Sequence, residues 1–281
     1  MAETQAGLLA LIALPKGAAL VNVLTGIGDK AIAVSGGVDS MTLAVVAHRA
    51  DPERTTVCHA VSPAVPPEAT DRVRQYAVRE GWKLVVIDAG EFDDQRYLAN
   101  PLDRCFYCKT DLYGAIATRR AGTLMSGTNL DDLGDFRPGL KAAAAHGVVH
   151  PFVEAGFAKV DVRAAAAALG LDDIKALPAM PCLASRIETG IAVSPDLVRG
   201  VHAAERLVGA AVTADTVRCR VAHDGIRIEL DDDALARLST SRRTMLSNKV
   251  RNVFSATDAA DTVTFAAYRR GSAFLGKPGD D

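Results

Sequence analysis

Three cysteines and one glycine-rich loop are the parts of this chain whose residue types and spacing could do chemistry. Cys105 and Cys108 stand three residues apart, Cys182 follows in the segment Pro181-Cys-Leu-Ala-Ser-Arg186, and Ser35-Gly-Gly-Val-Asp-Ser40 precedes them all. A thiolate is a nucleophile and a metal ligand, and a glycine-rich turn before a helix binds phosphate. Together they predict activation of a carboxylate by ATP, followed by transfer of sulfur.

The glycine-rich loop lies where a predicted strand ends and a predicted helix begins. Backbone N–H groups and the helix dipole would point at an anion in this turn, Gly36 and Gly37 would let it approach closely, and Ser35 and Ser40 could add hydroxyl donors. Asp39 would repel phosphate unless a divalent cation lies between them, so it predicts a nucleotide bound with Mg²⁺. The alternative is an ordinary strand-to-helix turn. The chain has neither a Walker motif nor a Gly-x-Gly-x-x-Gly fingerprint.

The spacing of Cys105 and Cys108 would place two sulfurs on one face of a helix, within reach of a common metal. Cys182 is the candidate third ligand because it lies in an irregular loop beside Arg186, whose charge could favour the thiolate. Zinc, a dithiol redox couple, an iron–sulfur cluster and inert packing remain open. A four-iron cluster is favoured because three thiolates leave one iron free to carry an extra sulfide.

Composition excludes some classes of protein and favours others. The chain has 281 residues, is 49% hydrophobic and carries 32 basic against 34 acidic side chains, so no global positive field exists to hold nucleic acid. Its apolar runs are shorter than the roughly 20 residues of a membrane span, and Glu3 argues against a signal peptide. We expect a cytoplasmic protein. Five cysteines are too few for a disulfide framework, and Cys58 and Cys219 are expected to pack in the core.

The first part of the chain alternates apolar strands with helical segments, which predicts an α/β fold with a parallel sheet wrapped by helices and a nucleotide at the carboxyl ends of the strands. We assign residues 1–190 to this domain. The expected strands are 31–34, 55–61, 83–87 and 123–125, and the expected helices are 39–48, 68–80, one beginning near Cys105, and 160–169.

Residues 191–281 predict a smaller α+β domain. We expect a helix over 195–208, strands over 212–221 and 226–230 joined by a turn at His223-Asp-Gly225, helices to about residue 254, and a strand over 262–265. Arg218 and Arg220 are two apart on one strand, so they would face the same way and could hold a phosphate bidentately. A solvated basic edge is the alternative.

These motifs resemble the LarE family of the PP-loop ATP pyrophosphatase superfamily, the sulfur transferases that build a nickel-pincer nucleotide cofactor for lactate racemase. The resemblance runs from the loop at Ser35 to the end of the second domain. The segments that carry it are Ser35-Gly-Gly-Val-Asp-Ser40, Arg104-Cys-Phe-Tyr-Cys-Lys109, Gly127-Thr-Asn129, Asp135-Phe-Arg-Pro-Gly139, Pro181-Cys-Leu-Ala-Ser-Arg186 and Tyr268-Arg-Arg-Gly-Ser272.

The resemblance implies adenylation of pyridinium-3,5-biscarboxylic acid mononucleotide, loss of pyrophosphate and replacement of AMP by sulfur at both carboxylates. It implies ATP, Mg²⁺ and a [4Fe-4S] cluster as cofactors, a sulfur donor, and a homo-oligomer, a hexamer in the family. Family members with one cysteine at position 182 give up its own sulfur, whereas members with all three hold a cluster. The implied sites are catalytic Cys182, Asp39, Ser185 and Arg186; nucleotide-binding Ser35, Gly36, Gly37, Asp39, Ser40 and Gly127; substrate-phosphate Arg218, Arg220 and Glu229; and metal-binding Cys105, Cys108 and Cys182.

Two segments depart from the family pattern. Members tend to have Gly-Leu-Thr-Lys where this chain has Gly156-Phe-Ala-Lys159, which removes a hydroxyl suited to capping a helix, and acidic residues where this chain has Phe265-Ala-Ala267. Two other functions stay open. One is a PP-loop tRNA thiolase, which the balanced charge disfavours, and the other is a non-catalytic nucleotide sensor whose thiols hold zinc.

Overall fold

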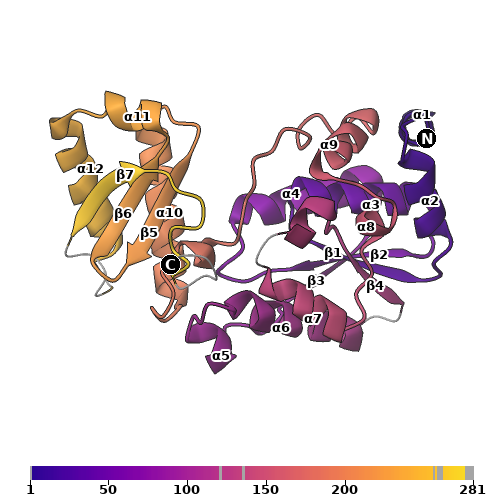
Figure 1. The fold of residues 1–281 in the computed structure, drawn as a ribbon, viewed down its shortest axis with the longest axis horizontal. Helices are drawn as coiled ribbons and strands as arrows, with labels where there is room; N and C mark the ends of the chain where they lie inside the picture. Colours follow the sequence, from indigo (N-terminus) through magenta and orange to yellow (C-terminus); the bar gives the residue numbers. More distant parts are fainter. Residues whose placement is uncertain (1, 120–121, 135–136, 256, 258–261, 276–281) are drawn as a thin grey trace. The chain divides into compact units, whose positions relative to one another are not determined.

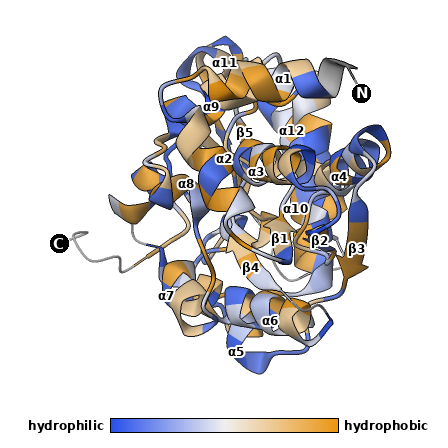
Figure 2. Ribbon diagram, turned by 90° about the vertical axis from the view of Figure 1, so that its right-hand side faces the viewer, coloured by the Kyte–Doolittle hydropathy of each residue, from blue (hydrophilic) through white to orange (hydrophobic). Residues whose placement is uncertain are grey.

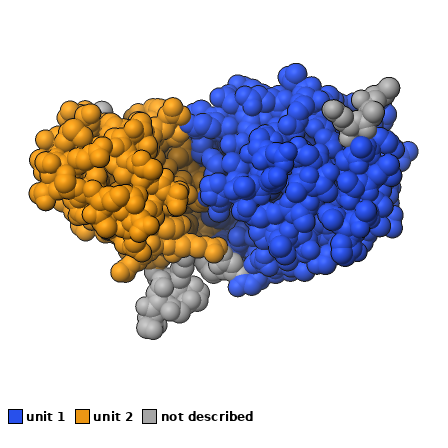
Figure 3. All heavy atoms as spheres, turned by 90° about the horizontal axis from the view of Figure 1, so that it is seen from above, with its two compact units in different colours: residues 1–91, 105–180 blue, residues 92–104, 181–281 orange. Residues whose placement is uncertain are grey.

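The computed structural model describes residues 2–119, 122–134, 137–255, 257 and 262–275. These residues form two compact units (Figure 3): unit 1 comprises residues 1–91 and 105–180, and unit 2 comprises residues 92–104 and 181–281. Asp135 and Phe136, which belong to one of the motifs above, lie outside the described residues. The functional division into domains of residues 1–190 and 191–281 remains a prediction.

Unit 1 is built on a four-stranded parallel sheet in the order β3-β2-β1-β4. Helices α3 and α4 lie on one face of this sheet, and α6 and α7 lie on the other (Figure 1). This arrangement confirms the predicted parallel sheet wrapped by helices. The strands are β1 (Lys30–Val34), β2 (Thr55–Ala60), β3 (Lys83–Ile87) and β4 (Thr123–Ser126).

Helices make up most of the rest of unit 1, and α1, α2, η1, α7 and α8 were not predicted from the sequence. The helices are α1 (Ala2–Ile12), α2 (Gly17–Thr25), α3 (Val38–Ala50), α4 (Pro67–Glu80), α6 (Arg104–Arg119), the 3₁₀ helix η1 (Leu130–Gly134), α7 (Pro138–Ala145), α8 (Pro151–Glu154) and α9 (Lys159–Ala168). In the described chain no single helix is long and apolar enough to cross a membrane, and Gln5–Ile12 with Gly17–Thr25 meets that requirement only as a pair bent by 116°.

Helix α3 is the centre of the unit 1 core. Nearly every side chain in its first ten residues is buried, including Met41, Leu43 and Val45. A helix that is apolar on all sides must be covered on all sides, and α3 contacts β1 and β2 on one side and α1, α2 and α9 on the other. Burial of seven apolar side chains, those of Val38, Met41, Leu43, Ala44, Val45, Val46 and Ala47, fixes α3, and therefore the turn that precedes it, against the sheet.

The edge strand β3 is covered less completely than the inner strands. It is strongly hydrophobic (Figure 2), yet Val86 is 43% exposed, whereas Ile32 in β1 and Val57 in β2 are fully buried. Inner strands of a parallel sheet are buried on both faces, and their sequences show continuous apolar runs. Because β3 has a similar apolar run, its sequence did not show that it is an edge strand.

Unit 2 contains a three-stranded sheet in the order β5-β6-β7. The antiparallel pair β5 (Val217–Ala222) and β6 (Gly225–Leu230) confirms the predicted hairpin, whose turn requires Gly225 at φ 121°. β7 (Val263–Ala267) pairs with β6 in parallel. The helices are α5 (Gln95–Leu98), the 3₁₀ helix η2 (Leu183–Arg186), α10 (Pro195–Ala211), α11 (Asp232–Arg237) and α12 (Thr240–Val253).

The predicted start of β5 at Val212 is wrong by five residues. α10 continues to Ala211, and β5 begins at Val217. The apolar residues between these two elements favour a strand by composition. These residues instead form a loop. The Asp231 carboxylate stabilises it by accepting hydrogen bonds from the N–H groups of Asp215 and Thr216.

Asn100 fastens residues 92–104 to the rest of unit 2. Its buried side-chain amide donates to the carbonyl oxygens of Glu188 (2.8 Å) and Ile191 (2.9 Å), its backbone oxygen accepts from Gly190 (2.9 Å), and its Oδ1 accepts from Arg104. Among the described residues, Asn100 is the non-glycine residue with a positive φ, 54°. Asparagine tolerates this conformation because its side chain can hydrogen-bond locally.

Asn100→Ala should destabilise the protein by about 2 kcal/mol or more, because buried carbonyls lose their donor and alanine is strained at positive φ. Urea denaturation measures the change. Asn248→Ala on the exposed face of α12, where the side chain accepts from Arg251, is the control and should change stability by no more than about 0.5 kcal/mol. Equal effects of the two substitutions would contradict the role given to Asn100.

Candidate functional site

The predicted phosphate loop occupies the turn between β1 and α3. Gly37 is the N-cap of α3, so the first N–H groups of the helix have no intrahelical acceptor and are available to an anion. The hydroxyl of Ser40 accepts from the N–H of Ser35 at 3.1 Å and lies 3.2 Å from the hydroxyl of Ser35. The Ser40 hydroxyl therefore forms hydrogen bonds within the loop, whereas the side chain of Ser35 is exposed.

Two glycines are required where other backbone segments approach the loop. Gly36 has φ +81°, and a Cβ there would lie 2.7 Å from the carbonyl oxygen of Ala69. A Cβ on Gly127, just after β4, would lie 2.7 Å from the backbone nitrogen of Ser40. A larger side chain at Gly36 would displace the start of α4, and one at Gly127 would displace the first turn of α3. The structure thus brings Gly127 and the phosphate loop together, as the sequence motifs indicated.

His59 of β2 links the end of β1, just before the loop, to helix α4. Its buried ring lies with Nδ1 3.0 Å from the Val34 carbonyl oxygen and Nε2 2.9 Å from the Thr70 hydroxyl of α4. Burial lowers the pKa of His59, so the ring is neutral at pH 7. A neutral ring can donate to Val34 through Nδ1 and accept from Thr70 through Nε2. His59 was assigned no role from the sequence, where its signal is its position near the carboxyl end of a strand.

Asp39 is held by two side chains that arrive from later parts of unit 1. Its carboxylate forms an ion pair with Lys159 Nζ at 2.5 Å and accepts from the Asn129 amide at 3.3 Å. The backbone N–H of Lys159 donates to Asp131, which fixes the start of α9 beside η1. Lys159 was not predicted as a site residue, although it belongs to the segment Gly156-Phe-Ala-Lys159.

Cys105 and Cys108 lie in the first turns of α6, as predicted. They are three residues apart on this helix, so their side chains share one face, and both are partly exposed. Tyr113, further along α6, is buried in the core beneath the sheet. The two thiols are therefore held on a helix that core packing fixes, and both can reach a ligand.

Cys182 is the N-cap residue of η2 in unit 2 and is partly exposed. Arg186 donates to the backbone oxygens of Pro181 (2.6 Å) and Cys182 (3.0 Å) and to the Ser185 hydroxyl (3.1 Å). Its Nε also pairs with Glu205 of α10 at 3.0 Å. Arg186 therefore shapes the loop that presents Cys182. Glu205, like His59 and Lys159, was not identified as a site residue from the sequence.

Arg220 and Glu229 form a buried ion pair across β5 and β6, with Nε 2.9 Å from Oε2. The remaining nitrogens of Arg220 donate to the backbone oxygens of Ser185 and Arg269, and Glu229 accepts from the Ser272 hydroxyl at 2.7 Å. The motif Tyr268-Arg-Arg-Gly-Ser272 is thus hydrogen-bonded to both members of this ion pair. Arg220 holds the Cys182 loop in place through Ser185.

Arg218 lies on the same face of β5 as Arg220, since Cys219 between them is buried on the other side. Burial and the neighbouring charge of Arg186 lower the pKa of Arg218, although it stays charged at neutral pH. A partly buried guanidinium near two other arginines is a site that an anion would stabilise. Burial also raises the pKa of the Cys219 thiol, which fits the inert core role predicted for this residue.

The three proposed metal-binding cysteines do not belong to one compact unit, because Cys105 and Cys108 are in unit 1 and Cys182 is in unit 2. Within the ranges that the structure describes, no three His, Cys, Asp or Glu side chains gather into a group that could hold a metal. Convergence of the three thiols on one cluster therefore remains a prediction.

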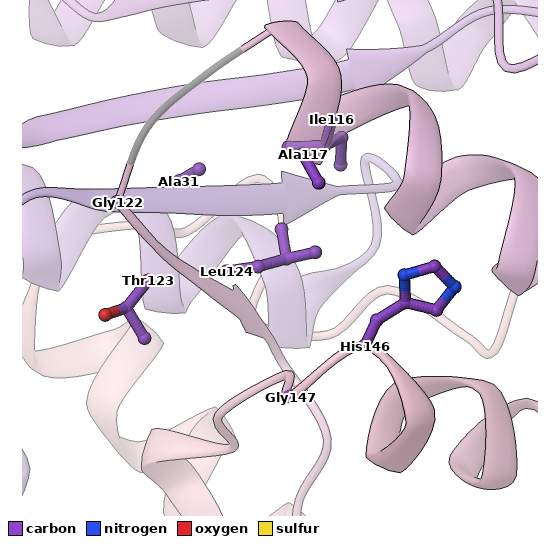
Figure 4. Close-up of a pocket in the computed structure, with 8 residues that line it drawn as sticks. All are labelled: Ala31, Ile116, Ala117, Gly122, Thr123, Leu124, His146 and Gly147. Atoms are coloured by element: carbon purple, nitrogen blue, oxygen red, sulfur yellow. The ribbon is translucent and has the colours of Figure 1, made fainter.

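A pocket in unit 1 lies away from the phosphate loop (Figure 4). It is lined by the start of β4 at Thr123 and Leu124, by Ile116 of α6 and by His146. These strand residues are at the amino end of the sheet, whereas the loop follows its carboxyl end. In open α/β sheets ligands bind at the carboxyl end, so this pocket is not the candidate site.

Comparison with known proteins points to one activity. The pyridinium-3,5-bisthiocarboxylic acid mononucleotide synthase of Lactiplantibacillus plantarum is 30% identical over 222 residues, which cover 77% of this chain and 80% of that protein. An uncharacterized protein of Synechocystis sp. is 33% identical over 211 residues, 73% of this chain and 77% of the relative. An uncharacterized protein of Methanocaldococcus jannaschii is 25% identical over 207 residues. No family model matches the chain.

The N-terminus of α9 lacks the side-chain cap that its position allows. Ala158 is the N-cap residue, with φ −87° and ψ 174°, and it makes no side-chain cap hydrogen bond. Asp161 accepts from the Ala158 N–H at 2.8 Å, which supplies one half of a capping box. This finding agrees with the expectation that Gly156-Phe-Ala-Lys159 loses a capping hydroxyl.

Ala158→Thr should therefore raise the stability of the protein by about 0.5 to 1 kcal/mol, because the new hydroxyl can accept from a first-turn N–H of α9. Thermal unfolding of the variant measures the gain. Ala158→Val is the matched control, since valine has the shape of threonine without the hydroxyl, and it should give no gain. A valine variant as stable as the threonine variant would show that capping is not the cause.

Proposed function

Because this chain belongs to the LarE family, the pyridinium-3,5-bisthiocarboxylic acid mononucleotide synthases, we propose that it uses ATP to convert both carboxylates of pyridinium-3,5-biscarboxylic acid mononucleotide into thiocarboxylates. The observation that carries the proposal in this chain is the loop Ser35–Ser40, whose packing against neighbouring backbone requires Gly36 and Gly127 and whose Asp39 lies in the first turn of α3, paired with Lys159. A sulfur transferase of this kind needs a nucleotide site and a thiol, and the chain has both.

The first half of the reaction is adenylation. A carboxylate oxygen of the substrate attacks the α-phosphorus of ATP, the bond from that phosphorus to the bridging oxygen breaks, and pyrophosphate leaves with the electron pair. The N–H groups at the start of α3 and the Ser35 hydroxyl stabilise the phosphate charge. The product is a mixed anhydride with AMP, whose carbonyl carbon is a far better electrophile than the original carboxylate.

Asp39, by binding Mg²⁺, and Lys159 would together offset the negative charge of the bound triphosphate. The Asp39 carboxylate is a hard oxygen donor of the kind that Mg²⁺ prefers, and both members of the Asp39–Lys159 pair are partly exposed and so reachable by a ligand. Mg²⁺, when bound at Asp39, would supply positive charge to the phosphates. Lys159 would then be free to donate to a phosphate oxygen, since its carboxylate partner would be shared with the metal.

The second half of the reaction is attack by sulfur on the activated carbonyl, with AMP as the leaving group. Cys182, partly exposed at the start of η2, is the thiol that we assign to this step, and Arg186 and Ser185 hold its loop. The donor set also fits a [4Fe-4S] cluster, because Cys105 and Cys108 present two reachable thiols on one face of α6. Cys105, Cys108 and Cys182 would hold the cluster, which would supply a sulfide.

Unit 2 provides the groups for the substrate's own phosphate. Arg218 is the residue whose charge is partly buried beside other arginines, and it would take the phosphate. Arg220 and Glu229 support it through their ion pair across β5 and β6. A sulfur donor that restores the transferred sulfur, and a homo-oligomer, belong to the same proposal.

Asp39→Asn should slow pyrophosphate formation by about a hundredfold or more, because the site loses its carboxylate for the metal-bound nucleotide. Release of pyrophosphate with ATP, Mg²⁺ and the dicarboxylate substrate measures the effect. Asp88→Asn, which changes an exposed carboxylate that follows the end of β3, is the control and should change the rate less than twofold. An unchanged rate in Asp39→Asn would remove the loop assignment.

Cys105→Ala, Cys108→Ala and Cys182→Ala should each abolish the brown colour of protein prepared without oxygen and stop thiocarboxylate formation, while pyrophosphate release continues. Iron and sulfide analysis and the absorption spectrum measure the cluster. Cys219→Ala, which changes a fully buried thiol, should keep both colour and activity. A colourless wild type in which Cys182 loses the mass of H₂S on turnover would exclude the cluster and favour a sacrificial cysteine.

A further inference from the structure

The phosphate loop has no basic side chain of its own. Ser35-Gly-Gly-Val-Asp-Ser40 contributes hydroxyls, backbone N–H groups and one negative charge, whereas a triphosphate brings several negative charges. Positive charge must therefore come from outside the loop. Lys159 is one source, but it is paired with Asp39 at 2.5 Å. A second cation contacts the loop from helix α4, where Arg72 Nη1 donates to the carbonyl oxygen of Gly36 at 2.8 Å.

The topology of the sheet explains why α4 lies against the loop. β1 and β2 are parallel neighbours with Val34 opposite His59, so the segments that follow them leave the same edge of the sheet. The Ala69 carbonyl of α4 fills the space where a Gly36 Cβ would stand, and Thr70 contacts His59, which contacts Val34. Arg72 is thus held beside the loop by a packed segment.

The guanidinium of Arg72 still has donors to offer. In the described structure its hydrogen bond uses Nη1, which leaves Nε and Nη2 without an acceptor, and no described carboxylate forms an ion pair with it. The side chain is half-buried, so water screens its charge less than at a free surface. A planar guanidinium with two adjacent N–H groups free is suited to bind phosphate oxygens bidentately.

We propose that Arg72 binds the β- and γ-phosphates of ATP and stabilises the pyrophosphate as it leaves. The inference rests on the adenylation proposed above. When the bond between the α-phosphorus and the bridging oxygen breaks, the electron pair stays on that oxygen and pyrophosphate gains negative charge. Arg72 donates the N–H groups of Nε and Nη2 to this charge, while the hydrogen bond from Nη1 to the Gly36 carbonyl oxygen holds the guanidinium beside the loop.

The test is binding of inorganic pyrophosphate and of AMP, each with Mg²⁺, to the full chain by calorimetry. Arg72→Gln should weaken pyrophosphate binding by about tenfold to a hundredfold, the range for loss of hydrogen bonds to a charged group, and should change AMP binding less than twofold. Arg72→Lys, which keeps the charge but not the planar fork, should fall between Arg72→Gln and the wild type.

Arg74→Gln is the matched control because it removes the same charge from the exposed side of α4, two residues away. It should change pyrophosphate binding less than twofold. Equal effects of Arg72→Gln and Arg74→Gln would overturn the proposal, and so would an equal loss of AMP and pyrophosphate binding, which would show that Arg72 only orders the loop.

The outcome for Arg72 can be separated from the outcome for the proposed function. A wild type that binds pyrophosphate through Arg72 but forms none from ATP and the dicarboxylate would overturn the proposed substrate and leave Arg72 as a phosphate-binding residue. A wild type that binds no pyrophosphate would overturn both, because the loop would then not be a nucleotide site.

Discussion

The negative charge of Asp39 at the start of α3 is the constraint around which unit 1 is arranged. A carboxylate beside a phosphate site is unfavourable unless cations and donors surround it. Lys159 and Asn129 supply these from segments 120 and 90 residues further along the chain. The loop before Asp39 needs Gly36 and Gly127 because α4 and the segment after β4 approach it within contact distance. Packing of α3 in the core fixes the position of Asp39 relative to these groups.

In unit 2, two ion pairs hold the loop that carries the Cys182 thiol. The pairs Arg186–Glu205 and Arg220–Glu229 are almost completely buried. Buried ion pairs add little net stability, because desolvation of the charges offsets their attraction, but breaking one is costly. Their value here is geometric, since Arg186 binds the backbone on both sides of the Cys182 peptide and Arg220 binds Ser185. The loop with Cys182 therefore has a defined shape without regular secondary structure.

Local patterns predicted the local features of this protein well. The strand-to-helix turn at Ser35–Ser40, the parallel sheet and the hairpin at Gly225 follow from short sequence signals, and the structure confirms them. Lys159, Glu205 and His59 could not be predicted in this way, because each acts through a partner that is distant in the sequence. A lysine near a helix start and a histidine inside a strand look ordinary until the fold brings Asp39 and Val34 beside them.

We propose that ATP is split at the Ser35 loop to activate a carboxylate for sulfur. Transfer of oxygen isotope tests it most directly, because the carboxylate oxygen that attacks the α-phosphorus must leave with AMP. With substrate labelled with ¹⁸O in its carboxylates, the account predicts one labelled oxygen in the phosphate of AMP for each thiocarboxylate formed. Unlabelled AMP, or release of ADP and phosphate in place of AMP and pyrophosphate, would contradict it.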